Sequence, residues 1–140
     1  YVGRPKRVDA KLLKEIIKED FIPVIVPMGL DENGITYNIN ADTAAGAIAR
    51  SIKSRRLMLL TDIDGVLDNN DKLISEINTI EAKELINTET IHGGMIPKVK
   101  TCIDAINNGV RAVVILDGRK PHSILFELFS DKGSGTLIRK

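Results

Sequence analysis

The sequence predicts an α/β protein with a mostly parallel sheet and helices packed on its faces. Short apolar runs alternate with amphipathic segments, and glycine, proline, asparagine and aspartate mark the junctions between them. Strands and helices that alternate in this way form parallel sheets joined by right-handed crossovers. The chain has 140 residues, of which 43% are hydrophobic, and this is enough for one core. We therefore expect a single domain over residues 1–140.

A helix and a strand are expected first. Over residues 8–19 the apolar positions recur at helical spacing, and Asp9 is suited to cap the start of this helix. Residues 21–28 are almost continuously apolar, which is typical of a strand buried on both faces. Pro23 should lie at the start of that strand, where its missing N–H costs least.

A hairpin and a helix of small residues should follow. The Asp-Glu-Asn-Gly sequence at 31–34 predicts a tight turn, and the extended stretch 35–38 predicts the second strand of a hairpin. Asn40 or Asp42 then caps an alanine-rich helix that we expect to end near residues 53–56. The small side chains would let this helix approach a sheet closely.

The second half of the chain alternates strands with helices. Strands are expected at residues 57–60, 112–116 and 135–138, and helices at 79–86, 96–107 and 122–129. The first two of these strands should be buried. Thr79 should cap the first of these helices, and Gly109 should end the second.

Composition and charge exclude several classes of protein. The 20 Lys and Arg residues nearly balance the 19 Asp and Glu residues, so a strongly basic nucleic-acid binder is not expected. No apolar run approaches the roughly 18 residues that span a membrane, and no signal peptide is evident, so we expect a soluble protein with no membrane partner. Cys102 is the only cysteine, which excludes an intrachain disulfide, and its place on an apolar helix face indicates a core residue.

Four polar segments should meet at one edge of the sheet. They are residues 28–29, 37–42, 62–67 and 92–98, each of which follows a strand or opens a helix. Ligands of open parallel sheets bind beyond the carboxyl ends of the strands, close to helix N-termini. We expect the functional site at this edge.

Lys98 gives the most direct indication of a phosphate. Gly93 and Gly94 precede a helix whose first turn accommodates Pro97. A lysine at this positive end of the helix is unfavourable unless an anion lies nearby, and a phosphate would supply one. The alternative is that Lys98 only extends into solvent, which is the commoner outcome after a glycine pair.

Asn38, Asn40 and Asp42 alternate where the hairpin leads into the alanine-rich helix. Asparagine and aspartate at such a junction are usually caps. The functional alternative is that one asparagine binds a polar substrate while Asp42 holds a lysine in position.

No metal site formed by protein ligands alone is expected. Asp62, Asp64 and Asp68 could be ligands, but the loop pattern of an EF-hand is absent and turn formation is the simpler interpretation. His92 and His122 have no partners at zinc-ligand spacing.

Four motifs resemble the amino acid kinase family, and within it the acetylglutamate kinases. They are Tyr-Asn-Ile-Asn-Ala-Asp at 37–42, Leu-Leu-Thr-Asp-Ile-Asp-Gly-Val-Leu at 59–67, Gly-Gly-Met-Ile-Pro-Lys-Val at 93–99, and Asp-Gly-Arg at 117–119. The resemblance covers essentially the whole chain. It implies a three-layer αβα sandwich like that of carbamate kinase. It also implies transfer of the γ-phosphoryl group of ATP to the γ-carboxylate of N-acetyl-L-glutamate, a step of arginine biosynthesis.

The resemblance also implies roles for individual residues. Asn38 would bind acetylglutamate, Asp42 would orient the catalytic lysines, and Lys98 would stabilise charge on the transferred phosphoryl group. A carboxylate nucleophile is already ionised at neutral pH and needs no general base. Mg²⁺ would arrive with ATP. The nucleotide site would comprise Asp62, Ile63, Asp64, Gly65, Val66, Leu67, Gly93, Gly94, Met95 and Lys98.

One departure from the family pattern is large. Members of the family begin with a first half that carries another catalytic lysine, a glycine pair and an arginine for the substrate, and none of this half is recognisable here. The chain also starts with Tyr1 and not with methionine. We therefore expect the C-terminal, nucleotide-binding portion, without the N-terminal substrate half and with little or no kinase activity on its own.

Residues 121–136 resemble the arginine-inhibited branch of the acetylglutamate kinases. Glu127 would pair with the guanidinium of L-arginine as feedback inhibitor, and the backbone of Gly133 would meet the same effector; an ordinary helix and polar turn are the alternative. The branch is cyanobacterial and plastid-like, forms hexamers when full length and includes members that bind a PII signalling protein. The expected location is a bacterial cytoplasm or a plastid stroma.

Two other functions remain open at this point. One is a different amino acid kinase of the glutamate 5-kinase type. The other is a non-catalytic regulatory module that binds nucleotide or arginine.

Overall fold

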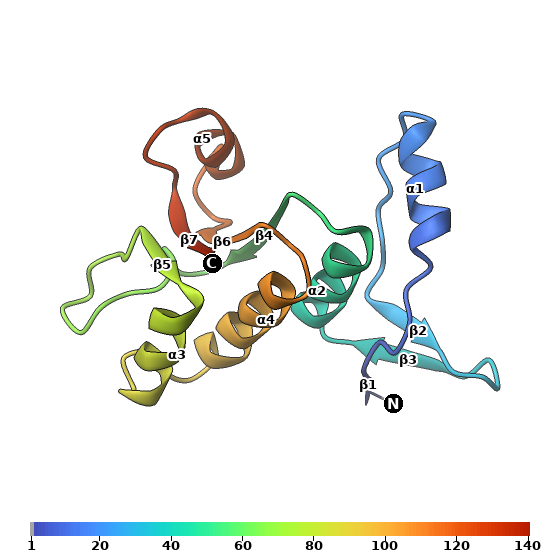
Figure 1. Ribbon diagram of the computed structural model, residues 1–140, viewed down its shortest axis with the longest axis horizontal. Helices are drawn as coiled ribbons and strands as arrows, with labels where there is room; N and C mark the ends of the chain where they lie inside the picture. The colour runs from blue at the N-terminus through green and yellow to red at the C-terminus, as the bar shows by residue number, and fades with distance from the viewer. Residues whose placement is uncertain (1) are drawn as a thin grey trace.

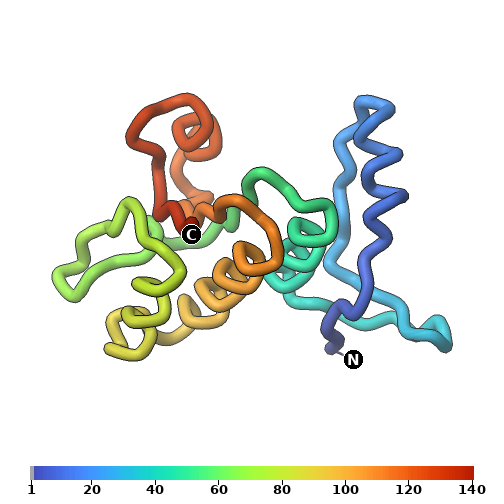
Figure 2. Tube along the Cα trace, viewed as in Figure 1, coloured from blue at the N-terminus to red at the C-terminus, as the bar shows by residue number. Residues whose placement is uncertain are grey.

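The structure is a computed structural model that describes residues 2–140. Its strands form two sheets, ordered β1-β3-β2 and β4-β6-β7-β5, and Figures 1 and 2 show the first sheet and α1 beside the rest of the molecule. The strands are β1 (Val2–Gly3), β2 (Met28–Leu30), β3 (Thr36–Ile39), β4 (Arg56–Thr61), β5 (Glu76–Asn78), β6 (Ala112–Asp117) and β7 (Gly135–Arg139). The helices are α1 (Ala10–Lys18), α2 (Ala41–Ile52), α3 (Thr79–Asn87), α4 (Met95–Asn107) and α5 (Ser123–Phe129).

The second sheet is the middle layer of an αβα sandwich, as the sequence predicts. Helices α3 and α4 lie on one face of this sheet and α5 on the other (Figure 1). Strand β4 is parallel to β6 and β5 is parallel to β7, whereas β6 and β7 are antiparallel. The core lies between α4 and the sheet and includes Val99 and Cys102 of α4, Val113 of β6 and Ile138 of β7.

The prediction of a buried strand over residues 21–28 is wrong. Strand β2 begins only at Met28, and the residues before it are exposed, with 88% of Ile22 and 92% of Val24 accessible. A strand is buried on both faces only when neighbouring strands and helices cover it, and no described strand pairs with residues 21–26. These residues therefore have the apolar pattern of a buried strand, but the described part of the chain lacks the neighbouring strands and helices that would bury it.

The hairpin predicted after this stretch is present. Strands β2 and β3 are antiparallel, and the carboxylate of Asp31 accepts hydrogen bonds from the backbone N–H groups of Asn33 and Ile35, both at 2.9 Å. Gly34 has φ +77°, a conformation that glycine adopts without strain. Asp9 caps α1 as predicted.

Three further expectations need correction. Helix α3 is capped by Asn78, with Glu81 completing a capping box, and not by Thr79. Strand β5 precedes this helix and was not predicted. Strand β4 lies at the sheet edge, so Leu57 and Leu59 are buried but Leu60 is 47% exposed.

Helix α2 contacts strand β4 of the second sheet, in line with the predicted approach to a sheet, and it packs more extensively against helix α4. A Cβ atom on Gly46 would lie 2.8 Å from Cγ2 of Thr101, so only a glycine permits this approach. Arg50 forms an ion pair with Asp104 near the C-terminal ends of the two helices. A second ion pair, between Asp42 and Lys98, joins their N-terminal ends. Helices α2 and α4 therefore run side by side in the same direction. No helix within residues 2–140 has the length and apolar character needed to cross a membrane.

Candidate functional site

Lys98 and Asp42 meet at the N-terminal ends of α4 and α2. The ammonium Nζ of Lys98 lies 2.6 Å from Oδ2 of Asp42, and the two side chains are only 20% and 23% exposed. Asp42 is favourable in the first turn of α2, where the helix dipole is positive, whereas Lys98 is unfavourable in the first turn of α4. The Asp42 carboxylate therefore supplies the anion that this lysine needs, and it holds the ammonium group between the N-terminal ends of α2 and α4.

The three alternating side chains before α2 have different positions. Asn40 is the N-cap, and its Oδ1 accepts a hydrogen bond from the N–H of Thr43 at 3.1 Å. Asp42 contacts Lys98, and Asn38 is exposed on β3. One residue thus caps the helix and another holds the lysine, while binding of a substrate by an asparagine stays a prediction.

The glycine pair before α4 contains one glycine that the backbone requires. Gly93 has φ +54°, whereas Gly94 is the N-cap with φ −67° and gives no side-chain cap. A Cβ atom at either position would meet no other atom within 4 Å. Open space therefore lies beside the amide groups that start the helix, and Met95 is the first residue of α4.

The loop over residues 62–67 is held in place by Thr136 of strand β7. Gly65 has φ +150°, and a Cβ atom there would lie 2.6 Å from Oγ1 of Thr136. The same hydroxyl accepts a hydrogen bond from the N–H of Val66 at 2.8 Å and donates one to the carbonyl of Ile74 at 2.6 Å. Gly65 and Val66 are buried and so hold the loop, while Asp62, Ile63 and Asp64 face solvent and Leu67 is half-buried.

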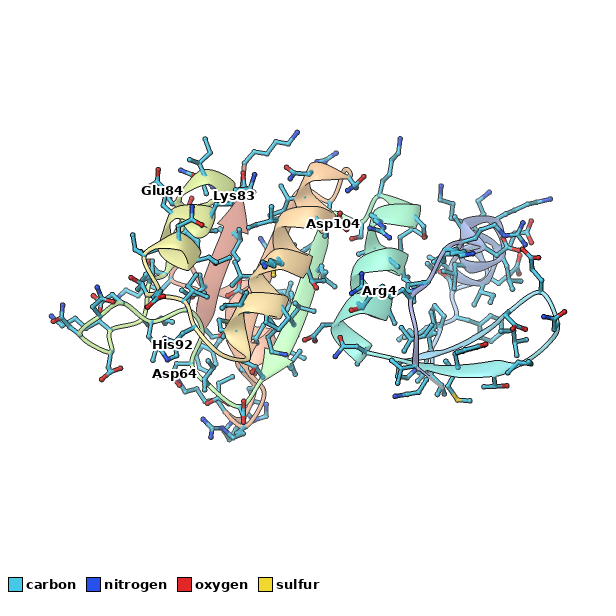
Figure 3. The ribbon with its side chains drawn as sticks, turned by 90° about the horizontal axis from the view of Figure 1, so that it is seen from below. Arg4, Asp64, Lys83, Glu84, His92 and Asp104 are labelled. Atoms are coloured by element: carbon cyan, nitrogen blue, oxygen red, sulfur yellow. The ribbon has the colours of Figure 1, made fainter. Side chains whose placement is uncertain are left out.

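This loop and the start of α4 lie at the same edge of the second sheet, where β4 and β6 end in register at Thr61 and Asp117. Figure 3 shows Asp64 and His92 together at one end of the sheet, with Lys83 and Glu84 of α3 at the opposite end. Two of the four predicted segments thus converge. Of the other two, residues 37–42 reach this region through Asp42, whereas residues 28–29 lie on β2 in the first sheet and do not.

Charged residues after β6 complete this edge. Arg119 donates hydrogen bonds from Nε to Oδ1 and from Nη2 to Oδ2 of Asp117, at 3.0 and 2.9 Å. These bonds lower the pKa of the buried Asp117 carboxyl to about 2 and raise the pKa of Arg119. Lys120 Nζ lies 2.8 Å from Oδ1 of Asp64. The motif at 117–119 was noticed in the sequence, but nothing there indicated these contacts.

Glu127 and Gly133, the predicted effector residues, are adjacent. The Glu127 side chain is 8% exposed, and its Oε2 accepts a hydrogen bond from the N–H of Ser134 at 3.0 Å. Gly133 has φ +65°, and a Cβ atom there would lie 2.6 Å from this oxygen. Arg56 Nη1 lies 3.6 Å from Oε1 of Glu127. Arg56 was not singled out from the sequence, because it belongs to a basic cluster typical of a solvated helix end.

Other predicted features lie outside this edge. Asp68 forms a turn, accepting from the N–H groups of Asn70 and Lys72. Burial raises the pKa of the Cys102 thiol to about 12, with a further contribution from the charge of Asp42, and the residue lies in the core as expected. Within residues 2–140 no group of three or more His, Cys, Asp or Glu residues is arranged to hold a metal ion.

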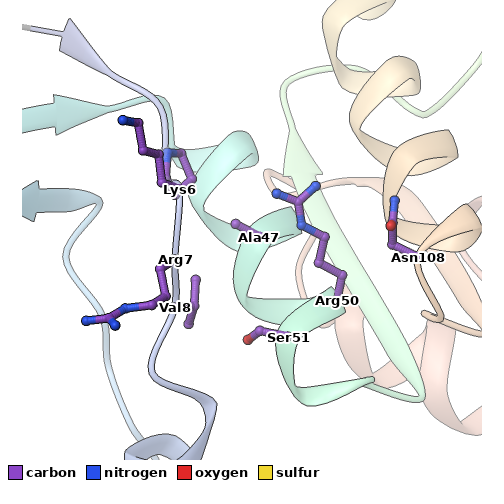
Figure 4. A pocket seen from close by; sticks show the side chains of 8 residues that line it. Lys6, Arg7, Val8, Ala47, Arg50, Ser51 and Asn108 are labelled. Carbon is purple, nitrogen blue, oxygen red and sulfur yellow. The ribbon is translucent and has the colours of Figure 1, made fainter.

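A cavity lies between the segment that follows β1 and the C-terminal half of α2 (Figure 4). None of the predicted site residues lines it. Figure 4 shows the side chains of Lys6 and Arg7 pointing away from α2, so their charges do not converge on the cavity. Its lining residues are Pro5, Lys6, Arg7, Val8, Ala47, Arg50, Ser51 and Asn108.

Comparisons with known proteins agree with this architecture. The chain is 61% identical over all 140 residues to an acetylglutamate kinase of Pelagibacter ubique and 53% identical to one of Rhodopseudomonas palustris, and it spans 49% and 47% of their lengths. The chain thus spans about half the length of the curated relatives it matches. An N-acetylglutamate synthase structure from Neisseria gonorrhoeae, complexed with coenzyme A and L-arginine, superimposes with a TM-score of 0.94 at 29% identity and covers 100% of this chain and 32% of that one.

A carbamate kinase from Giardia lamblia shares the fold, with a TM-score of 0.76 at 22% identity over 99% of this chain and 47% of that one. The model of the amino acid kinase family matches residues 1–117. On this evidence the chain belongs to the amino acid kinase family.

Proposed function

We propose that this chain is the nucleotide-binding portion of an acetylglutamate kinase, which transfers the γ-phosphoryl group of ATP to the γ-carboxylate of N-acetyl-L-glutamate. The contact between Lys98 and Asp42 carries the proposal, since it fixes an ammonium group at the opening of two helices. The identity of 61% to the Pelagibacter enzyme supports the same reaction. Both observations come from the half of the protein that this chain represents.

The chemistry that we propose depends on positioning and charge. An acetylglutamate carboxylate is already a nucleophile, so no general base is required. Lys98 would stabilise the negative charge that develops on the transferred phosphoryl group, and Asp42 would keep its ammonium oriented. Mg²⁺ would arrive bound to the phosphates of ATP and neutralise part of their charge.

The nucleotide would lie along the edge formed by the 62–67 loop and the start of α4. The open space beside Gly93 and Gly94 supports this placement, since phosphate oxygens can approach exposed amide groups at a helix start. In this arrangement Asn38, which precedes the cap of α2, would contact acetylglutamate.

A further segment of the protein would complete the substrate site and cover the exposed apolar residues. Ile22 and Val24 are almost fully accessible, and a surface of this kind usually marks an interface. We therefore expect little or no turnover from the 140 residues alone.

Regulation by L-arginine is also proposed. Its guanidinium would bind the Glu127 carboxylate beside Gly133, where it would compete with Arg56 for Oε1. Hexamer formation and binding of a PII protein belong to the same proposal. The relatives named above are bacterial, which supports a bacterial cytoplasm over a plastid stroma.

A second candidate is a regulatory module that binds arginine without transferring phosphate. It is favoured by the TM-score of 0.94 to a synthase whose structure is a complex with L-arginine and coenzyme A. Isothermal titration of the 140-residue chain with ADP and with L-arginine separates the two. An arginine signal that Glu127→Ala removes, together with no ADP binding, would establish the module and reject the kinase.

Turnover can be tested in a chimera in which this chain replaces the matching segment of the Pelagibacter enzyme. We expect release of ADP with N-acetyl-L-glutamate as acceptor and none with free glutamate. Release of ADP with free glutamate alone would instead identify a kinase of the glutamate 5-kinase type. A folded chimera without activity on either acceptor would contradict the proposed reaction.

A further inference from the structure

Two loops at the carboxyl edge of the second sheet are joined by opposite charges. The 62–67 loop follows β4, and residues 118–120 follow β6. Lys120 Nζ lies 2.8 Å from Oδ1 of Asp64, and the N–H of Gly118 donates to the carbonyl of Thr61 at 2.8 Å. The side chains of Lys120 and Asp64 are 50% and 49% exposed. A pair this accessible adds little to stability, so its charges call for another explanation.

Arg119 brings a second cation to the same loop. Its guanidinium donates hydrogen bonds to both carboxylate oxygens of the buried Asp117, yet the Arg119 side chain remains 65% exposed. The charges of Asp62 and Asp64 also contribute to raising the pKa of this guanidinium. A long, flexible side chain is thereby fixed by Asp117, and the edge carries three acids, Asp62, Asp64 and the buried Asp117, against the two bases Arg119 and Lys120.

This balance matters for an anionic ligand. Two unpaired carboxylates on the 62–67 loop would repel the phosphates of a nucleotide, and at a partly exposed edge such repulsion is only partly screened. Lys120 cancels the charge of Asp64 by direct contact. It also ties the loop to the end of β6, in addition to the hydrogen bond that joins Val66 to Thr136.

We propose that Lys120, supported by Arg119, is a positioning residue of the nucleotide site that neutralises Asp64, so that the 62–67 loop can receive the phosphates of a nucleoside diphosphate or triphosphate. Lys120 acts here through Asp64 and does not itself contact the phosphates. This inference rests on the proposed function, because it requires a nucleotide at this edge.

The test is a double-mutant cycle on the 140-residue chain, with ADP binding measured by isothermal titration in magnesium-free buffer at about 50 mM and about 500 mM NaCl. Lys120→Met should weaken ADP binding about fivefold at low salt, as expected for one partly screened unit charge, and much less at high salt. Asp64→Asn combined with Lys120→Met should restore the affinity to within about twofold of the unmodified chain. Circular dichroism checks that each variant is folded.

Lys83→Met is the matched control, since Lys83 is exposed at the opposite end of the sheet (Figure 3), and it should leave ADP binding unchanged. Equal binding by Lys120→Met and the unmodified chain would overturn the inference while the nucleotide site stands. A double variant as weak as Lys120→Met would also overturn it, because the lysine would then contact phosphate directly. If the unmodified chain binds no ADP, the proposed site and this inference fall together.

Discussion

Replacing Thr136 by valine should destabilise the fold by about 2 to 4 kcal/mol. Thr136 is fully buried, and its hydroxyl bridges the N–H of Val66 and the carbonyl of Ile74. Valine has the same shape but leaves both backbone groups without this partner, and each buried unsatisfied group costs about 1 to 3 kcal/mol. Added apolar contact recovers part of this cost. The loss is a large fraction of the roughly 5 to 15 kcal/mol that stabilises a typical domain.

Urea unfolding followed by circular dichroism measures this loss as a lower midpoint with an unchanged slope. Thr136→Ser is the matched control, because it keeps the hydroxyl and removes one buried methyl group, at a cost of about 1 kcal/mol. A valine variant as stable as the original chain would refute the bridging role. A serine variant as unstable as the valine variant would show that packing of the methyl group, and not the hydroxyl, accounts for the effect.

Three more outcomes follow from the same structure. Because the pKa of Asp117 is lowered to about 2, the ionised carboxylate contributes fully to the free energy of unfolding above its ordinary pKa near 4, and this contribution is lost as the pH falls toward 2. Asp117→Asn should remove this part of the acid dependence of the urea midpoint. Since the pKa of Cys102 is raised to about 12 by burial, alkylation at pH 8 should proceed only through unfolding, and rapid labelling of the folded chain would contradict its burial. Gly133→Ala should lower the free energy of unfolding by about 1 to 3 kcal/mol, and with it the urea midpoint, because φ is +65° and the new methyl group would lie 2.6 Å from Glu127 Oε2.

Local signals account for what the sequence predicted well. Asp9 and the turn at residues 31–34 act through hydrogen bonds to neighbouring backbone groups, so their structure depends little on the rest of the chain. The cap and the turn are fixed by contacts within a few residues. The alternation of strands and helices in the second half predicted a sheet with helices on its faces, and the family resemblance implied the three layers.

The rest depends on contacts that are distant in sequence. Residues 21–27 have the composition of a buried strand, yet all of them except the half-buried Pro23 and Pro27 are exposed. Strand β5 has a single buried residue, Ile77, too little for any periodicity. Ion pairs such as that of Arg56 with Glu127 join residues far apart in the chain and have no local signature. A contact of Asp42 with a lysine was one of two alternatives that the residues left open, and the family resemblance then assigned the lysine role at this site to Lys98.

The central claim is that Lys98 stabilises the transferred phosphoryl group, and the turnover of the chimera carrying Lys98→Ala tests it most directly. Lys100→Ala is the control, because Lys100 is exposed on the same helix and has no assigned role. Loss of a cation at a phosphoryl-transfer transition state lowers kcat by roughly 10³- to 10⁵-fold in comparable enzymes. We predict a loss in this range for Lys98→Ala with Lys100→Ala unchanged, whereas a loss below about tenfold in a folded chimera would contradict the account.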